Sequence, residues 1–339
     1  MHSTPLLPNA RQRGVTLTEL MIALVLGALV VLAATAMVVS SRGTYRTQDE
    51  STRLAESARF GLELSNRLVR LAGYTNFGDD IALPASYTVD STWTLAPDSY
   101  ALNGPNVVGS DNSKPGGGAG YNGSDSVTIR FFGSSPTNSP VADGNVLDCA
   151  GLPVPQAPSP ATPAVANNAR SYNALYVDLD TDGEPALKCQ RQKFDPATGA
   201  PLGLDTPQTL IRGVEDFQVL YGELIAKPSP DDDLDINAPA SIVYRTGLGG
   251  ANPVINWSNV RTVRIGMLLR SAVGARPTPE AAATSYPLFG EKYPGAADTG
   301  STFTLASQSV ADRTRVRRVV ETTIFIRNRM ADWPSLQSP

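Results

Sequence analysis

Few residues of this chain have side chains that could perform nucleophilic or transition-metal chemistry. The 339 residues include a single histidine, His2, and two cysteines. Ser-His and Cys-His nucleophiles, and most transition-metal sites, need more of these residue types than that. The sequence also contains neither a Gly-x-Ser-x-Gly turn nor a Gly-Lys-Ser/Thr phosphate loop. These absences argue against the enzyme class, whether anchored or secreted.

The two cysteines, Cys149 and Cys189, are 40 residues apart. For an exported domain the simplest interpretation is a disulfide that closes the chain between them, and two free thiols are the alternative. The chain-entropy model assigns a loop of this length about 4 kcal/mol of stabilisation. We therefore predict a disulfide between Cys149 and Cys189.

A run of acidic residues has the opening spacing of a calcium loop. Asp178, Asp180 and Asp182 alternate along the chain, and Gly183 follows them. The twelfth position of such a loop, where a bidentate Glu belongs, is occupied by Cys189. A hairpin turn with solvated carboxylates is therefore the better interpretation, as a solvated loop is for the second acidic cluster, 231–235. We expect no cofactor, with calcium at the three aspartates as the alternative.

An apolar stretch near the N-terminus organises the chain. Leu20 to Val39 is 20 residues long without a charge, which as a helix covers roughly 30 Å of hydrocarbon. A secretory signal peptide ending at the small residues 34–36 would explain the stretch, and so would a plain anchor. A plain anchor, however, leaves Glu19 without a purpose, because a carboxylate at the membrane is costly and usually has a partner.

The residues around Glu19 favour a third interpretation. The segment Arg13 to Leu20, Arg-Gly-Val-Thr-Leu-Thr-Glu-Leu, resembles the class III signal of type IV prepilins. The resemblance implies that residues 1–14 are a leader, that a prepilin peptidase cuts between Gly14 and Val15, and that Val15 becomes N-methylated. It also implies that Glu19 pairs with the free amine of a neighbouring subunit's first residue. An amine and a carboxylate that meet in an apolar bundle stabilise each other's charged forms.

The helix is expected to continue far beyond the apolar stretch, from about residue 15 to residue 72. No proline interrupts 44–72, and near-heptad apolar positions there predict an amphipathic half that packs on a sheet, with a juxtamembrane coiled coil as the alternative. Gly73 is the expected stop. Such a helix is roughly 85 to 90 Å long. The apolar stripe consists of Leu54, Ala58, Gly61, Leu62, Leu64, Leu68 and Leu71.

Residues 73–339 are expected to form a β-rich globular head with long loops. The chain holds 29 glycines and 27 prolines, which indicate many turns. Loops are predicted for 74–123, where aromatic residues pin the loop to the body, and for 277–302. The predicted fold class is α+β, a long N-terminal helix packed on an antiparallel sheet. Strands are predicted at 125–132, 174–180, 185–190, 217–221, 263–269 and 319–326.

Several landmarks of the head resemble the PilW family of minor pilins. They span most of the chain beyond the leader. Family members often have an Asp/Gly-rich turn after the Tyr-Gly that corresponds to Tyr221-Gly222. This chain has a Pro/Asp loop there. The landmarks are Asp148-Cys-Ala-Gly151, Leu187-Lys-Cys189, Ile211 to Gly222, Trp257 to Val260 with Val263 to Ser271, and Arg318 to Asn328.

The resemblance implies a minor pilin that helps to prime or cap a type IV pilus and supports adhesion and twitching. It implies an inner-membrane protein with a cytoplasmic N-terminus and periplasmic head, which later joins the pilus at the cell surface. Its partners would be other pilins, the prepilin peptidase and the inner-membrane assembly platform. The net charge of −4 does not suggest nucleic acid as the main partner. The alternatives are a large pseudopilin of a type II secretion system and a tip adhesin or DNA-uptake subunit.

Overall fold

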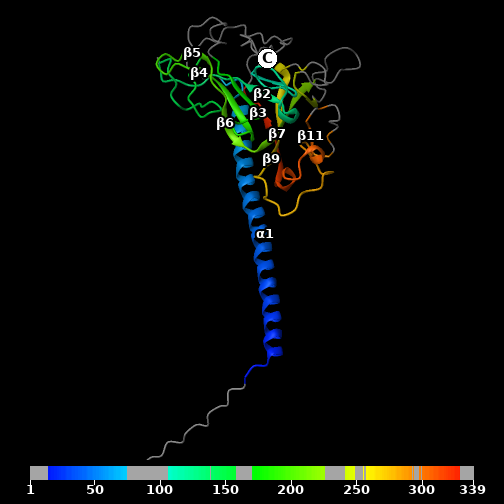
Figure 1. Ribbon diagram of the computed structural model, residues 1–339. Coiled ribbons are helices and arrows are strands. Elements are labelled where there is room, and N and C mark those ends of the chain that lie inside the picture. Colours follow the sequence, from blue (N-terminus) through cyan, green and yellow to red (C-terminus); the bar gives the residue numbers. More distant parts are fainter. Residues whose placement is uncertain are drawn as a thin grey trace, which may run out of the picture.

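One long helix and a β-sheet head make up the molecule in this computed structural model (Figure 1). The helix α1 (Leu17–Leu71) carries the head on its second half, while its first half extends away from the rest of the chain. This arrangement confirms the predicted α+β class. The structure describes residues 14–74, 106–137, 139–157, 170–225, 241–248, 255, 257–291, 293, 298 and 300–328. The leader residues 1–13, the loop aromatics of 75–105 and the acidic cluster 231–235 lie outside the described residues.

The helix begins and ends where its local chemistry changes. Thr16 is the N-cap, with extended backbone at φ −73° and ψ 152°. At the other end, Gly73 has φ +70°, a left-handed conformation that favours glycine. A Cβ on Gly73 would also lie 2.6 Å from Asn106 Nδ2, so a side chain does not fit there. With 55 residues, α1 is about 82 Å long.

A six-stranded antiparallel sheet forms one part of the head. Its strands follow the order β1-β2-β3-β4-β5, and β6 also pairs with β4. The strand β1 lies inside the segment 74–123, which was predicted to be a loop. Its four residues are too few for an alternation of apolar and polar residues to reveal a strand. The strands are β1 (Val107–Ser110), β2 (Ser126–Ile129), β3 (Asn173–Leu179), β4 (Pro185–Phe194), β5 (Pro201–Leu204) and β6 (Gln208–Arg212).

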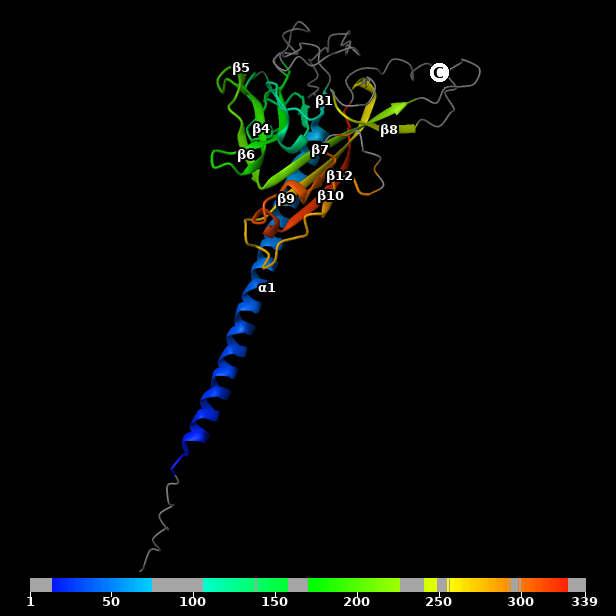
Figure 2. The same cartoon turned by 45° about the vertical axis from the view of Figure 1, so that its right-hand side comes forward.

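A four-stranded antiparallel sheet, in the order β12-β9-β7-β8, forms the other part (Figure 2). Its long central strands alternate apolar and polar residues, as the sequence predicted. The segment 277–302, predicted as one loop, instead contains β10, which pairs with β11. The strands are β7 (Val214–Ile225), β8 (Ser241–Arg245), β9 (Val260–Arg270), β10 (Ser285–Pro287), β11 (Thr302–Thr304) and β12 (Arg317–Phe325). Short 3-10 turns are η1 (Tyr121–Gly123), η2 (Trp257–Asn259), η4 (Leu305–Ser307) and η5 (Asp312–Thr314).

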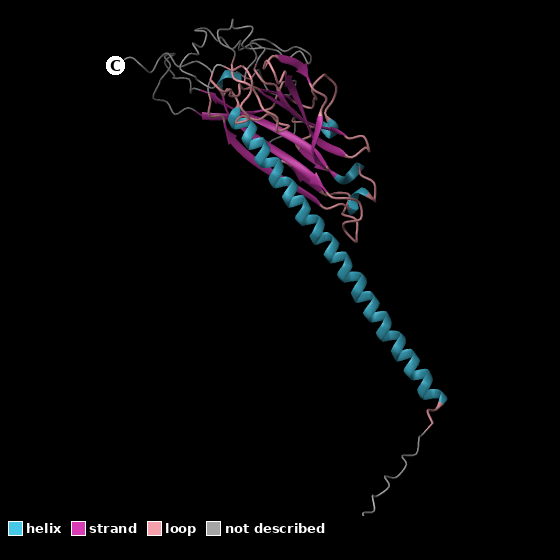
Figure 3. Cartoon of the chain, turned by 90° about the vertical axis from the view of Figure 1, so that its left-hand side faces the viewer, coloured by secondary structure: helices cyan, strands magenta, loops and turns pink. Residues whose placement is uncertain are grey.

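The second half of α1 lies across the sheets (Figure 3) and contacts β12, β9 and β2. The predicted apolar stripe is the face that is buried: Leu54, Ala58, Leu64 and Leu68 belong to the main core. Gly61 allows a close approach, because a Cβ there would lie 2.9 Å from Ile211 Cδ1 and 3.1 Å from Met267 Cε. The amphipathic half is therefore part of the head and not a separate coiled coil.

Candidate assembly site

The first turn of α1 is closed by a reciprocal pair of hydrogen bonds. The Glu19 backbone N–H donates to Thr16 Oγ1 at 3.3 Å, and the Thr16 backbone N–H donates to Glu19 Oε2 at 2.9 Å. This capping box satisfies two helix N–H groups that have no partner in the ladder. The sequence contains the Thr-x-x-Glu signature of this capping box, so Glu19 has a role within its own chain in addition to the predicted pairing with another subunit. Glu19 thus also defines where the helix starts.

The predicted cleavage position lies just outside this cap. Gly14 and Val15 precede the helix and are exposed. Neither residue is part of regular secondary structure, so a protease would not have to unwind the helix to reach the bond between them. Within its own chain, the Glu19 carboxylate accepts hydrogen bonds from Thr16. The pairing predicted for Val15 and Glu19 therefore concerns two subunits and remains a prediction.

The first half of α1 presents an apolar surface that no other part of the described chain covers. From Val15 to Val39 the exposed fraction of every large apolar side chain lies between 51% for Val38 and 77% for Met37. Among the described residues, α1 is the only helix that is long and apolar enough to cross a membrane. Because so much apolar surface is costly in water, this half requires lipid or other helices around it.

The disulfide prediction is confirmed. Cys149 and Cys189 are bonded, with their Cα atoms 6.0 Å apart, and both side chains are buried. Cys189 lies on β4, and the Cys149 backbone N–H donates to Asn173 Oδ1 at 2.8 Å on the neighbouring strand β3. The bond therefore fixes the long segment between β2 and β3 to the centre of the six-stranded sheet.

Each of the three aspartates considered as calcium ligands forms an ion pair with a lysine or arginine of the protein. Asp178 Oδ2 lies 2.9 Å from Lys114 Nζ, Asp180 Oδ2 lies 3.4 Å from Arg212 Nη1, and Asp182 pairs with Arg212 Nη2. The backbone closes the β3–β4 turn, since the Asp180 N–H donates to the Glu184 carbonyl at 2.8 Å. Among the described residues no three His, Cys, Asp or Glu side chains are placed to hold a metal. The turn thus engages its carboxylates in ion pairs.

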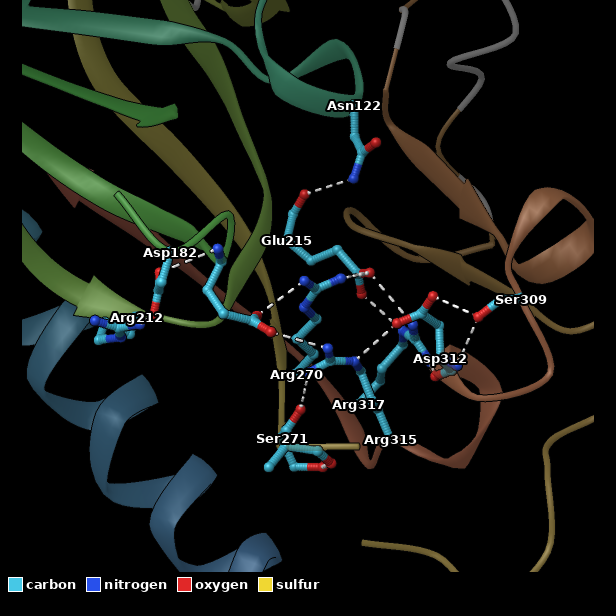
Figure 4. Close-up of polar contacts among 12 residues, drawn as sticks. Asn122, Asp182, Arg212, Glu215, Arg270, Ser271, Ser309, Asp312, Arg315 and Arg317 are labelled. Carbon is cyan, nitrogen blue, oxygen red and sulfur yellow. Dashed lines mark hydrogen bonds and ion pairs between the residues drawn. The ribbon is translucent and has the colours of Figure 1, made fainter. Parts of the chain in front are cut away.

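A buried ion network joins the two sheets at the end of the head where β9 ends and β12 begins (Figure 4). Glu215, at the start of β7, accepts from Arg317 Nε at 2.7 Å and from Arg270 Nη1 at 2.9 Å. Arg270 and Arg315 each also donate to Glu184 at 2.9 Å, from the β3–β4 turn. The Glu215 and Arg317 side chains are 1% and 0% exposed. The pairing compensates charges that would otherwise be very costly to bury.

Sequence reasoning missed a second group of buried acids. Asp111, Asp125 and Asp298 interact with one another beside β1, and all three are buried. Burial raises the pKa of Asp298 to about 7, and burial together with the Asp111 charge raises that of Asp125 well above its usual value. The backbone N–H groups of Val219 and Asn112 donate to Asp125. Asp298 lies 173 residues after Asp125, so no local pattern could have grouped the three.

Two protein-family models match parts of this chain. The model of the prokaryotic N-terminal methylation motif matches residues 9–35. The model of the type IV pilus-assembly protein W family matches residues 174–328. The second match covers just under half of the chain, and the two matches come from different models. No curated protein sequence matches. A type IV-like pilin from Thermus thermophilus is structurally similar at 12% identity and a TM-score of 0.35, covering 81% of this chain and 96% of that one.

Proposed function

We propose that this chain is a type IV minor pilin of the PilW family, which primes pilus assembly and stays at or near the tip. One observation carries the proposal. A helix of 55 residues joins an uncovered apolar half to a half that is built into the head. Because the helix is continuous, the packing of its apolar half against the helices of other subunits would set the position of the head.

The proposed sequence of events starts at the leader. The prepilin peptidase removes residues 1–14 and methylates Val15, while Leu20 to Val39 spans the inner membrane with the head in the periplasm. On assembly, Glu19 pairs with the amine of a neighbouring subunit's first residue and sets the register between the two helices. The capping box supports this step, because it holds the Glu19 carboxylate at the start of the helix, one turn from Val15.

The head supports a place at the tip. Its sheets carry long insertions, and such insertions would crowd a close-packed helical lattice if the subunit were repeated along the shaft. The proposed partners are other minor and major pilins, through α1, and the assembly platform of the inner membrane. The family consists of structural subunits, and accordingly no catalytic role is proposed.

The first test is the intact mass and N-terminal sequence of the membrane-extracted protein, with and without an active prepilin peptidase. We expect peptidase-dependent loss of residues 1–14 and a methylated Val15. An uncut N-terminus would leave a simple anchored protein, and a chain beginning after Ala36 would be a secreted one. Either result would remove the basis of the assembly mechanism.

A second test concerns Glu19. We expect Glu19→Gln to leave processing intact, because the peptidase cuts on the other side of Val15, and to reduce the protein's incorporation into sheared pili at least tenfold. Glutamine keeps an oxygen for the helix cap but removes the charge that pairs with the amine. Thr16→Val is the matched control, since it removes the threonine's side of the cap while keeping the carboxylate. Equal incorporation of Glu19→Gln and the natural protein would overturn the register role.

A further inference from the structure

The end of the head nearest the apolar half of α1 consists of two loops beside the helix, which we call the collar. We define this collar as the loops 271–280 and 309–314, which form the gold and orange-red segments beside α1 in Figures 1 and 2. Thr47 Oγ1 donates to the Ala275 carbonyl at 2.7 Å, and Pro277 lies 3.8 Å from where a Cβ on Gly43 would be. The collar therefore meets α1 only four to eight residues beyond Val39.

The two loops of the collar form one body. The Gly274 backbone N–H donates to Thr314 Oγ1 at 2.8 Å, and the Arg276 backbone N–H donates to the Thr314 carbonyl at 2.8 Å. Arg315, a member of the buried network, donates to the Ser271 carbonyl at 2.7 Å. Contacts with the helix on one side and the network on the other hold the collar at a set height on α1.

The height of the collar coincides with the surface of a membrane that α1 spans. If Leu20 to Val39 fills the hydrocarbon, Gly43 and Thr47 lie about 6 and 12 Å above it at about 1.5 Å per residue. The polar layer of one leaflet is roughly 5 to 8 Å thick. The collar thus stands at the outer boundary of the lipid headgroups.

The side chains at this level suit a lipid surface. Val273 and Val310, one in each loop, are 50% and 61% exposed. Arg42 and Arg46 are exposed on α1, and within the described residues neither has a carboxylate partner. Arg313 has a backbone partner, the Glu280 carbonyl at 3.0 Å, and the carboxylate of Glu280 is taken by Arg276. Within the two loops and on α1 from Arg42 to Thr47, the arginines Arg42, Arg46, Arg276 and Arg313 outnumber the acids Glu280 and Asp312, so this part of the surface has an excess of two positive charges.

We propose that the collar, with Arg42 and Arg46, binds the anionic phospholipid headgroups of the membrane in which α1 stands, and so holds the head upright before the subunit enters the filament. The chemistry is that of an interfacial anchor, in which exposed apolar side chains enter the headgroup layer while cations meet lipid phosphates. The inference rests on the membrane span of the proposed function and adds a lipid contact for the head.

Fluorescence quenching in lipid nanodiscs tests this contact. The full chain would carry an environment-sensitive fluorophore at Val310→Cys in the collar, at Leu202→Cys in β5 at the far end of the head, or at Val31→Cys in the span, with the native disulfide intact. Leu202 is a matched control because it is 58% exposed, close to the 61% of Val310. The probes are nitroxides on the lipid headgroup or on the acyl chain, in phosphatidylcholine discs with or without phosphatidylglycerol.

In discs that contain phosphatidylglycerol, we expect the headgroup nitroxide to quench the label at position 310 several-fold more than the label at 202. The variant carrying Arg42→Gln and Arg46→Gln should lose most of that quenching, because each arginine near an anionic surface strengthens binding by about fivefold. Lys193→Gln, at the β5 end of the head, should change nothing.

The label in the span separates the two ways of failing. If the acyl-chain nitroxide quenches the label at position 31 while the labels at 310 and 202 are quenched equally, α1 spans the membrane but the collar does not touch it, and the proposal is overturned. If the label at 31 is not quenched, the span itself is wrong, and the proposed function falls with it. Equal quenching at 310 with and without phosphatidylglycerol would overturn the role of the arginines.

Discussion

At the scale of single residues, the head buries acids that it does not pair with cations. Asp216, on β7, is 0% exposed, and one of its oxygens accepts from Ser124 Oγ, the Phe217 N–H and Gln218 Nε2. Its other oxygen has no partner among the described residues. Burial raises the pKa of Asp216 to about 8. Between its unfolded pKa near 3.8 and its folded pKa of about 8, the aspartate is therefore protonated in the folded protein and ionised in the unfolded chain.

The raised pKa values predict a head that is less stable at higher pH. A carboxyl whose folded pKa exceeds its unfolded value near 3.8 contributes its full stability below pH 4 and loses it as the pH rises towards 7 for Asp298 and 8 for Asp216. Asp216→Asn keeps the oxygen that accepts three hydrogen bonds and removes the charge. We expect the variant to gain about 1 to 3 kcal/mol over the natural protein at pH 8 and almost nothing at pH 4.

The measurement is urea unfolding of the full chain in detergent micelles, followed by tryptophan fluorescence, to which the buried Trp257 contributes. The comparison between variant and natural protein at each pH isolates Asp216 from the Asp111, Asp125 and Asp298 group, which titrates in both proteins. A gain in stability of the same size at pH 4 and pH 8 would show that the charge of Asp216 is not the cause.

At the scale of elements, α1 is one continuous helix in two environments. Its first half needs external partners, while its second half contributes Leu54, Leu64 and Leu68 to the main core. The helix packs closely on the sheets at Gly61, which has no side chain to separate α1 from Ile211 on β6 and Met267 on β9. The sheets therefore fix both the height and the rotation of the helix.

Replacing this glycine tests the packing. We expect Gly61→Val to lower the free energy of unfolding by about 1 to 3 kcal/mol, because the added carbons must displace Ile211 and Met267. Arg59→Val, on the exposed face two residues earlier, introduces the same β-branched residue into the same helix without a contact to the sheets. Equal unfolding midpoints for the two variants would show that the helix shifts freely on the sheets.

At the scale of the whole molecule, the buried ion network connects parts that are distant in sequence. Glu215 accepts from arginines of β9 and β12, and Glu184 brings in the β3–β4 turn of the other sheet. The same group supports the collar through the bond from Arg315 to Ser271. The network thus couples the relative position of the two sheets to the part of the head that touches α1 near the membrane end.

We expect Glu215→Gln to lower the free energy of unfolding by about 3 to 5 kcal/mol, because it leaves the fully buried guanidinium of Arg317 without its carboxylate. The matched control is Glu321→Gln, which removes the partner of Arg264 in an ion pair whose side chains are 27% and 45% exposed. That exposed pair should contribute at most about 1 kcal/mol. Chemical denaturation of the natural protein and the two variants measures these losses in the free energy of unfolding. Equal losses for the two variants would contradict a structural role of the network.

The sequence alone determined the features whose physics is local. The uncharged run from Leu20 to Val39, the apolar stripe after residue 44, the stop at Gly73 and the long alternating strands follow from period and residue type. The Cys149–Cys189 bond was also predictable, because the chain has two cysteines in all and they therefore have a single possible pairing. Even the capping box of Thr16 and Glu19 was readable, since it spans one helical turn.

Only the tertiary structure decided the features that depend on distant segments. The strand β1 forms because β2 pairs with it, and β10 because β11 does, although both are too short to show a period of their own. The sequence could not group Asp111, Asp125 and Asp298, nor bring Glu184 and Glu215 to the arginines of β9 and β12. Burial and ion pairing depend on which segments meet in space, and the antiparallel register of the strands decides that rather than the order of residues along the chain.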